Sequence, residues 1–160
     1  MKITDILDGD LIIPELTSKN KKEVVEELVS VIAEQDKRID KAELTEVLLE
    51  REKLGSTGIG DGIAIPHGKL KSIDTLRASF GRSREGVGFE SMDGKPTHLF
   101  FLLVAPKNSA SIHLKALARI SRLLKDGPFR KNLMEAKSKE ELFNTIIERD
   151  EKEDLLRDNR

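Results

Sequence analysis

The chain of 160 residues contains no cysteine, no tryptophan and no tyrosine. Without cysteine, disulfides, thiolate metal ligands and a cysteine nucleophile are excluded. Without tryptophan and tyrosine, the aromatic side chains that commonly stack on single-stranded nucleic acid are missing. The 28 lysines and arginines nearly balance the 29 aspartates and glutamates, which argues against a polyanion binder held by bulk charge. We therefore expect no nucleic-acid partner.

Long apolar runs are scarce as well. The longest, LFFLLVA at 99–105, has the length of a buried strand and falls far short of a membrane span. The first ten residues, MKITDILDGD, include acidic residues and lack the apolar stretch of a signal peptide. A chain of this length buries one hydrophobic core more comfortably than two. The sequence thus predicts a single globular domain in the cytoplasm, with no membrane insertion.

Hydrophobic periodicity and capping signals predict the secondary structure. The expected helices are 20–35, a second from Asp40 to Gly55, a third from Ser109 or Ser111 that ends at Gly127-Pro128, a short one near 129–136, and one from Ser138. The expected strands are 11–16 as an edge strand or extended loop, 63–65, an antiparallel pair at 76–80 and 87–89, and a central strand at 98–105. Their interleaving predicts an α/β fold, a mixed β-sheet with helices packed on both faces in a single domain.

The segment GSTGIGDG at 55–62 has four glycines in eight positions and is expected to form a loop. A P-loop is excluded, because Gly62 to Gly68-Lys69 is one residue too long and Leu70 stands where a serine or threonine is needed. No G-x-G-x-x-G occurs in 55–68, and no G-x-S-x-G occurs in the chain. Neither nucleotide binding nor a serine hydrolase is indicated.

The three histidines are His67, His98 and His113. They lack the close spacing of a metal-binding motif, so a metal site would need folding to bring them together. Pro66 fixes the local φ and restricts Ile65 to extended geometry, so His67 is presented rigidly. Such a histidine is either a hydrogen-bonded rim residue or a nucleophile that attacks a phosphoryl group. We interpret His98 as structural.

Phosphoryl chemistry needs cations or N–H groups beside the nucleophile. Arg51 lies on the apolar face of its expected helix, where it either snorkels past the core or points into a site under the glycine-rich loop. His113 lies on the apolar face of a first helical turn, where exposed N–H groups favour anions. The alternative for His113 is a partly buried structural histidine, and the pattern alone leaves both alternatives open.

The segment REKLGSTGIGDGIAIPHGKL at 51–70 resembles the active-site signature of the type-2 enzyme IIA (EIIA) domains of the bacterial phosphoenolpyruvate-dependent phosphotransferase system (PTS). It is most similar to the nitrogen-regulatory branch. THLFFLLVAP at 97–106 and the histidine-bearing helix start at 113 fit the same family. The resemblance covers about residues 1–150 and implies one EIIA domain there. It leaves 151–160 as a charged C-terminal tail, and we expect the charged run from 148 to be a frayed helical extension or a mobile tail.

The resemblance also implies a role for each candidate residue. His67 would be the phosphoacceptor, as a tele-phosphohistidine, and would take its phosphoryl group from the phosphohistidine of an HPr-like carrier. Arg51 would stabilise the phosphate, and His113 would support or orient it. The implied reaction needs no cofactor and no metal. Asp61 adds a carboxylate expected close to His67, where it would raise the pKa of His67, repel phosphate, or be solvated.

Three functions remain open from the sequence. The first is a nitrogen-regulatory phosphocarrier, in which the phosphorylation of His67 changes which regulatory target the protein binds. The second is a sugar-specific EIIA of the fructose or mannitol type, which passes phosphate to the cysteine of a IIB domain. The third is a non-enzymatic binding module that has lost phosphotransfer. The presence of Arg51, His67 and His113 together argues against the third.

Overall fold

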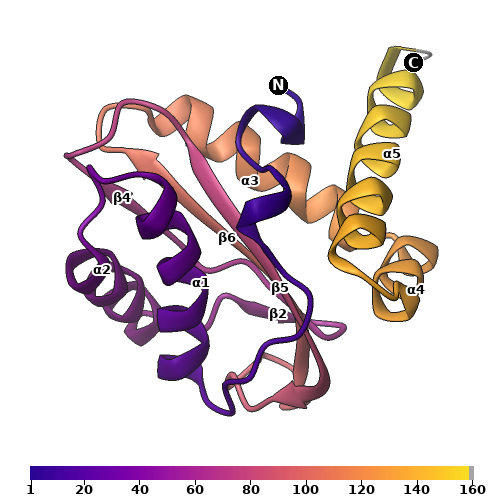
Figure 1. The fold of residues 1–160 in the computed structure, drawn as a ribbon, viewed down its shortest axis with the longest axis horizontal. Coiled ribbons are helices and arrows are strands. Elements are labelled where there is room, and N and C mark those ends of the chain that lie inside the picture. Colours follow the sequence, from indigo (N-terminus) through magenta and orange to yellow (C-terminus); the bar gives the residue numbers. More distant parts are fainter. Residues whose placement is uncertain (159–160) are drawn as a thin grey trace.

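In the computed structural model, which describes residues 1–158, a mixed sheet of six strands lies between two groups of helices (Figure 1). Helices α1 and α2 pack against strands β5 and β4, and α3 and α4 pack against β6 and β5. The helices are α1 (Lys21–Gln35), α2 (Lys41–Lys53), α3 (Ala110–Leu124), α4 (Gly127–Glu135) and α5 (Lys139–Asp158), after 3-10 turns at Ile3–Asp5 and Gly9–Leu11. This arrangement confirms the predicted α/β class, with helices on both faces of a mixed sheet.

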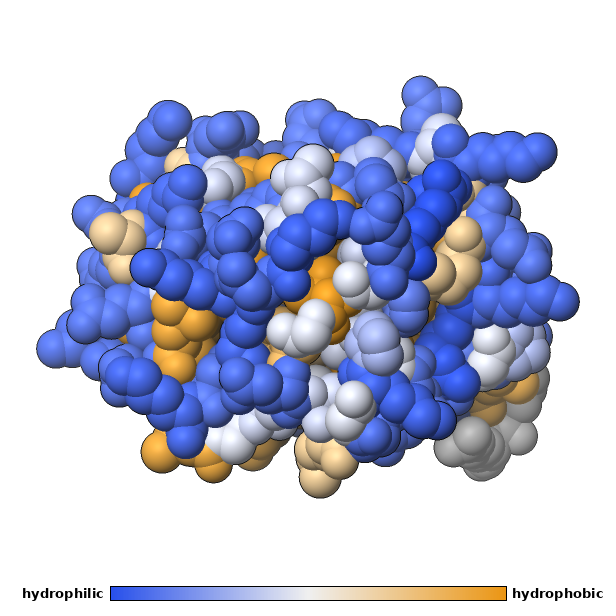
Figure 2. Space-filling model, turned by 90° about the horizontal axis from the view of Figure 1, so that it is seen from below, coloured by the Kyte–Doolittle hydropathy of each residue, from blue (hydrophilic) through white to orange (hydrophobic). Residues whose placement is uncertain are grey.

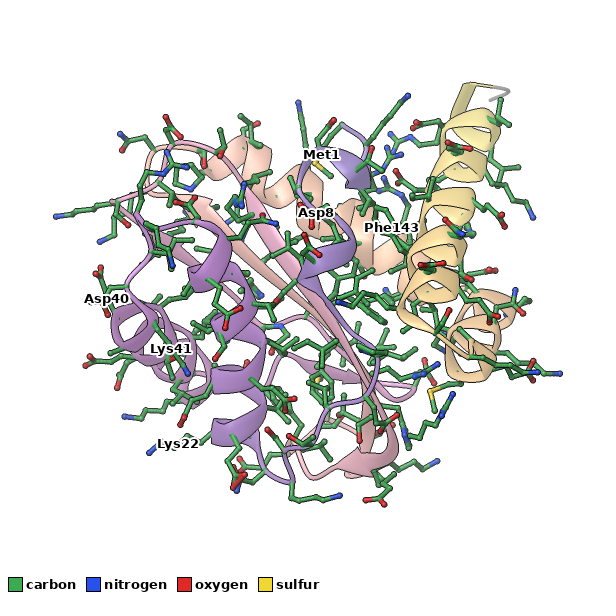
Figure 3. All side chains as sticks on the ribbon, in the orientation of Figure 1. Met1, Asp8, Lys22, Asp40, Lys41 and Phe143 are labelled. Carbon is green, nitrogen blue, oxygen red and sulfur yellow. The ribbon has the colours of Figure 1, made fainter. Side chains whose placement is uncertain are left out.

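The helix starts follow the predicted capping signals. The Asp40 side chain accepts a hydrogen bond from the Glu43 N–H (2.9 Å) where α2 begins (Figure 3). Asn20 caps α1 in the same way through the Glu23 N–H (3.0 Å). The Ser138 hydroxyl accepts from the first turn of α5. Each cap satisfies a backbone N–H that would otherwise have no partner, so the local sequence determines where these helices begin.

The sheet has the order β1-β5-β6-β3-β2, and β4 also pairs with β6. The strands are β1 (Ile12–Ile13), β2 (Gly58–Gly60), β3 (Ile63–Ala64), β4 (His67–Leu70), β5 (Arg77–Val87) and β6 (Thr97–Pro106). Strand β6 runs antiparallel to β5 on one side and parallel to β3 and β4 on the other. Its side chains from Leu99 to Ala105 are each at most 2 % exposed, which confirms the central strand. Strand β1 lies at an edge, as Pro14 predicts.

The predicted pair of strands at 76–80 and 87–89 is wrong. The structure has one long strand, β5, whose register against β6 shifts between Arg82 and Val87. The polar residues that suggested a turn stay in the strand because Arg82, only 2 % exposed, donates to three backbone carbonyls. Those carbonyls belong to Pro14 (3.0 Å), Leu133 (2.8 Å) and Ala136 (2.5 Å).

Three smaller boundaries also differ from the prediction. The segment 55–62 is not all loop, because Gly58–Gly60 forms β2 and pairs with β3. The chain resumes as β4 directly after Pro66, whose carbonyl accepts the Leu103 N–H at 2.9 Å. Gly127 and Pro128 open α4 instead of ending α3, because proline is tolerated in a first helical turn, where its missing N–H would have no partner.

The face of the molecule seen from below is mainly hydrophilic, and apolar residues appear on it in separate patches (Figure 2). No helix within residues 1–158 is long and apolar enough to cross a membrane.

The charged run after residue 148 continues helix α5 through Asp158, as the helical alternative predicted. As far as Glu153 it packs against the domain, because Asp150 and Glu153 are buried. Asp150 accepts the Arg119 Nε at 2.6 Å and the Ile3 N–H at 2.7 Å, while Glu153 pairs with Arg122 at 3.1 Å. Residues 159–160 of the expected tail lie outside the described residues, and the domain boundary at 150 stays a prediction.

Replacing Asp150 with alanine should lower the free energy of unfolding by about 3 kcal/mol, because Arg119 would stay buried without its closest carboxylate. Arg119 would keep Asp154 at 2.9 Å, which limits the loss. Denaturant-induced unfolding measures the change. The matched control is Glu151→Ala, an exposed neighbour on α5. Equal losses in the two variants would contradict this role of Asp150.

Candidate active site

The backbone around His67 is fixed to the centre of the sheet. His67 is the first residue of β4 and lies opposite Leu103 of β6 in a parallel pairing. The preceding residue is tied as well, because the Pro66 carbonyl accepts the Leu103 N–H. The imidazole is half-buried. The backbone on which the ring is mounted is thus paired with the central strand.

A single hydrogen bond orients the His67 ring. Nδ1 donates to the Ile65 carbonyl at 2.7 Å, and because a carbonyl only accepts, Nδ1 carries the proton. In the neutral ring the free lone pair then lies on Nε2. Burial lowers the pKa of His67, and the Arg51 charge lowers it further, against the opposing effects of the Ile65 carbonyl and Glu52. The His67 ring is thus mainly neutral at pH 7, with its free lone pair on Nε2.

His113 lies in the first turn of α3 and meets His67 edge to face. The ring centroids are 5.6 Å apart and the rings are inclined at 76°. His113 is 5 % exposed, and its Nε2 is buried without a hydrogen-bond partner. Burial, followed by the charges of His67 and Lys69, lowers the pKa of His113 to about 4. The second ring is therefore neutral at pH 7 and retains an unused polar atom.

Arg51 brings positive charge to the same place from the last turn of α2. Its side chain is half-buried, and Nη1 donates to the Gly55 carbonyl at 2.9 Å. The charge lies near enough to lower the pKa of His67. The structure thus brings together all three predicted site residues, from α2, β4 and α3.

Asp61 does not lie where the sequence suggested. It is exposed at the turn before β3, with φ of 57°, whereas His67 follows the other end of that strand. Its N–H donates to the Asp93 carboxylate at 3.2 Å. The carboxylate that acts on the pKa of His67 is Glu52. His98, interpreted as structural, lies beside Asp61 and donates from Nδ1 to the Ser83 carbonyl at 2.8 Å.

Sequence reasoning missed Glu52, the buried carboxylate next to Arg51. It is 7 % exposed, accepts the Thr57 N–H at 3.1 Å, also accepts the Thr57 hydroxyl, and pairs with Lys21 Nζ at 3.1 Å. A signal was present in the chain. An acidic residue in the last turn of a helix opposes the helix dipole, so its presence there calls for a local reason.

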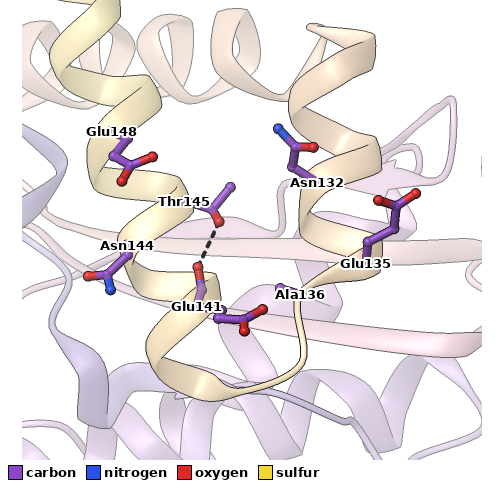
Figure 4. A pocket seen from close by; sticks show the side chains of 7 residues that line it. All are labelled: Asn132, Glu135, Ala136, Glu141, Asn144, Thr145 and Glu148. Atoms are coloured by element: carbon purple, nitrogen blue, oxygen red, sulfur yellow. Dashed lines mark hydrogen bonds between the residues drawn. The ribbon is translucent and has the colours of Figure 1, made fainter.

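Two hollows lie on other parts of the described surface. A hollow of about 320 Å³ lies between α4 and α5, where the Thr145 hydroxyl donates to the Glu141 carbonyl (Figure 4). A groove of about 650 Å³ between α1 and α2 includes Lys22 and Lys41 (Figure 3). His67 lines neither. Within residues 1–158, no group of three or more histidine, aspartate or glutamate side chains is placed to hold a metal ion.

The low pKa of His113 predicts a pH-dependent stability. The pKa of His113 is about 4 in the folded protein and has its ordinary value of 6.5 in the unfolded chain. Between these two pH values the unfolded chain binds a proton at His113 that the folded protein does not bind. The free energy of unfolding should therefore fall by up to about 3 kcal/mol as the pH drops through this window, and His67 adds to the fall in the same direction. Urea unfolding at several pH values measures it, with an NMR titration of the His113 ring.

The matched variant is His113→Gln, which has no titrating ring and should show a smaller pH dependence between pH 6.5 and 4. An NMR pKa of His113 near 6.5 would contradict the burial of a neutral ring.

Comparison with known proteins gives a family match over nearly the whole chain. The family model described as "Phosphoenolpyruvate-dependent sugar phosphotransferase system, EIIA 2" matches residues 5–149. The chain is 42% identical over 146 residues to the nitrogen regulatory protein of Bradyrhizobium diazoefficiens, which covers 91% of this chain and 95% of that protein. It is also 42% identical over 150 residues to the fructose-specific EIIABC component of Bacillus subtilis. That match covers 94% of this chain but only 24% of the larger protein.

A solved structure agrees with the same assignment. The crystal structure of nitrogen regulatory protein IIA-Ntr from Neisseria meningitidis superposes with a TM-score of 0.83 at 36% sequence identity, over 90% of this chain and 98% of that one. The sequence matches and the fold thus agree. The chain belongs to the type-2 EIIA family of the phosphoenolpyruvate-dependent sugar phosphotransferase system.

Proposed function

We propose that the protein is a phosphocarrier whose His67 Nε2 takes a phosphoryl group from the phosphohistidine of an HPr-like carrier and passes it on. The observation that carries this proposal is the hydrogen bond from His67 Nδ1 to the Ile65 carbonyl. It leaves Nε2 as the free lone pair of a neutral ring, the form that a nucleophile at phosphorus requires. The product would be a tele-phosphohistidine.

The transfer balances without any further reactant. The Nε2 lone pair of His67 forms the new N–P bond while the N–P bond of the donor phosphohistidine breaks, and its electron pair returns to the donor ring. The Nδ1 proton of His67 stays on the ring, where the Ile65 carbonyl stabilises the positive charge that develops. The geometry requires no cofactor and no metal for this step.

Two neighbours would stabilise the transferred group. Arg51 offers a guanidinium, whose donors match phosphoryl oxygens in pairs. His113 is neutral and its Nε2 has no partner, so in the Nε2–H tautomer it can donate one hydrogen bond to a phosphoryl oxygen. One positive charge and one neutral donor would thus meet the phosphate beside His67.

The surface beside these residues suits a protein partner. Leu54 is 84 % exposed three residues after Arg51, and Ile112 and Leu114, which flank His113, are 55 % and 66 % exposed. Exposed apolar side chains beside a reactive group are typical of an interaction surface. The general kind of partner for a PTS IIA protein is a phosphocarrier or a IIB domain. We assign the HPr-like donor to this surface, in the cytoplasm.

The destination of the phosphate separates the two branches of the family. Identity does not decide between them, because the nitrogen regulatory and the fructose-specific relatives are both 42% identical to this chain. The nitrogen regulatory relative matches over 95% of its own length, whereas the fructose-specific one contains the match as part of a larger protein. We therefore propose the regulatory role, in which phosphorylation changes the target that is bound. The sugar-specific role is the alternative.

Incubation with enzyme I, an HPr-like carrier and labelled phosphoenolpyruvate should place acid-labile phosphate on the wild-type chain and none on His67→Ala. Arg51→Lys keeps the charge but loses the paired donors, so its initial rate should fall by about 10²-fold. His98→Gln is the matched histidine control and should retain the wild-type rate. A wild type that takes no phosphate, or a His67→Ala variant that takes as much, would end the proposal.

The branch is tested with the phosphorylated protein. We expect no rapid transfer to the cysteine of a fructose-type or mannitol-type IIB domain when transfer is followed by loss of label from His67. The unphosphorylated protein is the control for non-specific labelling of the IIB domain. Transfer complete within seconds would instead assign the protein to the sugar-specific branch.

A further inference from the structure

We propose that Glu52 is a positioning residue for this phosphoryl transfer. Its buried carboxylate holds the turn 55–57 in the place from which both His67 and Arg51 are aligned. The inference rests on the proposed function of His67 and adds to it a residue that need not touch the phosphate.

Every polar bond of the Glu52 carboxylate goes to a fixed partner. Both of its oxygens lie within 3.3 Å of the Thr57 N–H, and the Thr57 hydroxyl donates to it as well. On its other side Lys21 Nζ lies 3.1 Å away, and the Lys21 side chain is only 15 % exposed. Lys21 is itself held, with Nζ 4.8 Å from the centroid of the Phe89 ring. The carboxylate therefore has little freedom to move.

A chain of hydrogen bonds leads from Glu52 to the reactive ring. Glu52 accepts from the Thr57 N–H, the Thr57 carbonyl accepts the Ile65 N–H at 3.1 Å, and the Ile65 carbonyl accepts His67 Nδ1 at 2.7 Å. The last of these bonds selects the tautomer that exposes the Nε2 lone pair. Displacement of Thr57 would move Ile65 and so weaken the bond that selects this tautomer.

A second connection leads from Glu52 to Arg51. The guanidinium is held by the Gly55 carbonyl, which lies two residues before Thr57. Gly55 has a φ of 143°, and Leu54 beside it is 84 % exposed, so no apolar side chain of 54 or 55 packs the turn into the core. Besides Thr57, the turn is anchored by the Gly55 N–H, which donates to the Glu52 carbonyl at 3.1 Å, and by the Ser56 hydroxyl, which donates to the Phe89 carbonyl at 3.2 Å. The Glu52–Thr57 contacts are thus a main restraint on the acceptor that orients Arg51.

A buried negative charge at the position of Glu52 is unfavourable unless nearby groups compensate for it. A carboxylate in the last turn of a helix opposes the dipole, and burial of its charge requires a matched partner. Its negative charge also acts on the ring, because it raises the pKa of His67 while burial and Arg51 lower it. The His113 ring lies against the His67 ring, and Lys69 is a further titratable group close enough to act on the pKa of His113. Loss of the Glu52 charge should therefore lower the pKa of His67.

The experiment compares Glu52→Gln with Glu50→Gln. Glutamine keeps the shape of glutamate but removes the charge that pairs with Lys21. Glu50 lies on the same helix, is 62 % exposed and pairs with Lys53, so its variant is the matched control. Two properties are measured: the initial rate of phosphate uptake from the HPr-like carrier, and the ring nitrogen shifts of unphosphorylated His67 by ¹⁵N NMR, which report its tautomer and pKa.

For Glu52→Gln we expect a rate lower by about 10- to 100-fold, a smaller Nδ1–H population and a lower pKa of His67. Glu50→Gln should match the wild type in all three. A folded Glu52→Gln variant with the wild-type rate and the wild-type tautomer would overturn the inference. The NMR comparison needs no phosphotransfer. A wild type that takes no phosphate would therefore remove the proposed function, while the NMR shifts would still show whether Glu52 orients the His67 ring.

Loss of the Lys21 pair could unfold Glu52→Gln, and circular dichroism detects this. Thr57 then provides the second pair of variants. Thr57→Val removes only the hydroxyl that donates to Glu52 and should slow phosphate uptake, whereas Thr57→Ser keeps the hydroxyl and should restore it. Equal, wild-type rates in both would overturn the inference.

Discussion

The hydrogen bond from His67 Nδ1 to the Ile65 carbonyl determines which nitrogen of the ring can react, and the surrounding structure holds that carbonyl in place. The Ile65 N–H is bonded to the Thr57 carbonyl, and the next carbonyl, that of Pro66, accepts an N–H of the central strand β6. Proline at 66 removes the remaining backbone freedom between them. The acceptor therefore lies in a two-residue connection between β3 and β4 that is bonded on both sides, so the ring is already oriented for the proposed role of Nε2.

Burial controls the charge of this site as much as its shape. Both rings, His67 and His113, have lowered pKa values and are neutral at pH 7, so the positive charges beside them are those of Arg51 and Lys69. Two protonated histidines in contact would repel one another, and a protonated His67 would have no lone pair for phosphorus. In the proposed function, fixed cations beside neutral rings would bind a phosphoryl group and also allow its release to the next acceptor. A reversible carrier requires both steps.

The sequence predicted most strongly the features that local chemistry determines. The helix starts at Asn20 and Asp40 are set by caps within four residues, and the strand at 98–105 is set by its own continuous apolarity. Strand β5 was mispredicted because its polar stretch is stabilised by distant carbonyls, those of Pro14, Leu133 and Ala136, with which Arg82 bonds. The sequence near Arg82 does not predict these partners, because they are more than 50 residues away along the chain.

The same distinction applies to the site. Arg51 and His67 are candidates from the sequence because phosphoryl chemistry needs a nucleophile and a cation, and because the segment 51–70 resembles the family signature. Glu52 was missed since its partners, Thr57 and Lys21, follow from how the turn and α1 meet in space. Asp61 was expected close to His67 because the two are near in sequence. Strand β3 lies between them, with Asp61 before one end and His67 after the other.

Helix α3 links the site to the far end of the molecule. It carries His113 in its first turn and Arg119 in its middle, and Arg119 is held by the Asp150 carboxylate, which also binds the Ile3 N–H. Helix α5 and the start of the chain therefore restrain the helix that presents His113, although neither bears a site residue. A ring with an unused Nε2 keeps its place only if its helix cannot shift, because no bond of that nitrogen fixes it. The buried ion pair between Arg119 and Asp150 is one such restraint, and it joins the helix that carries His113 to helix α5.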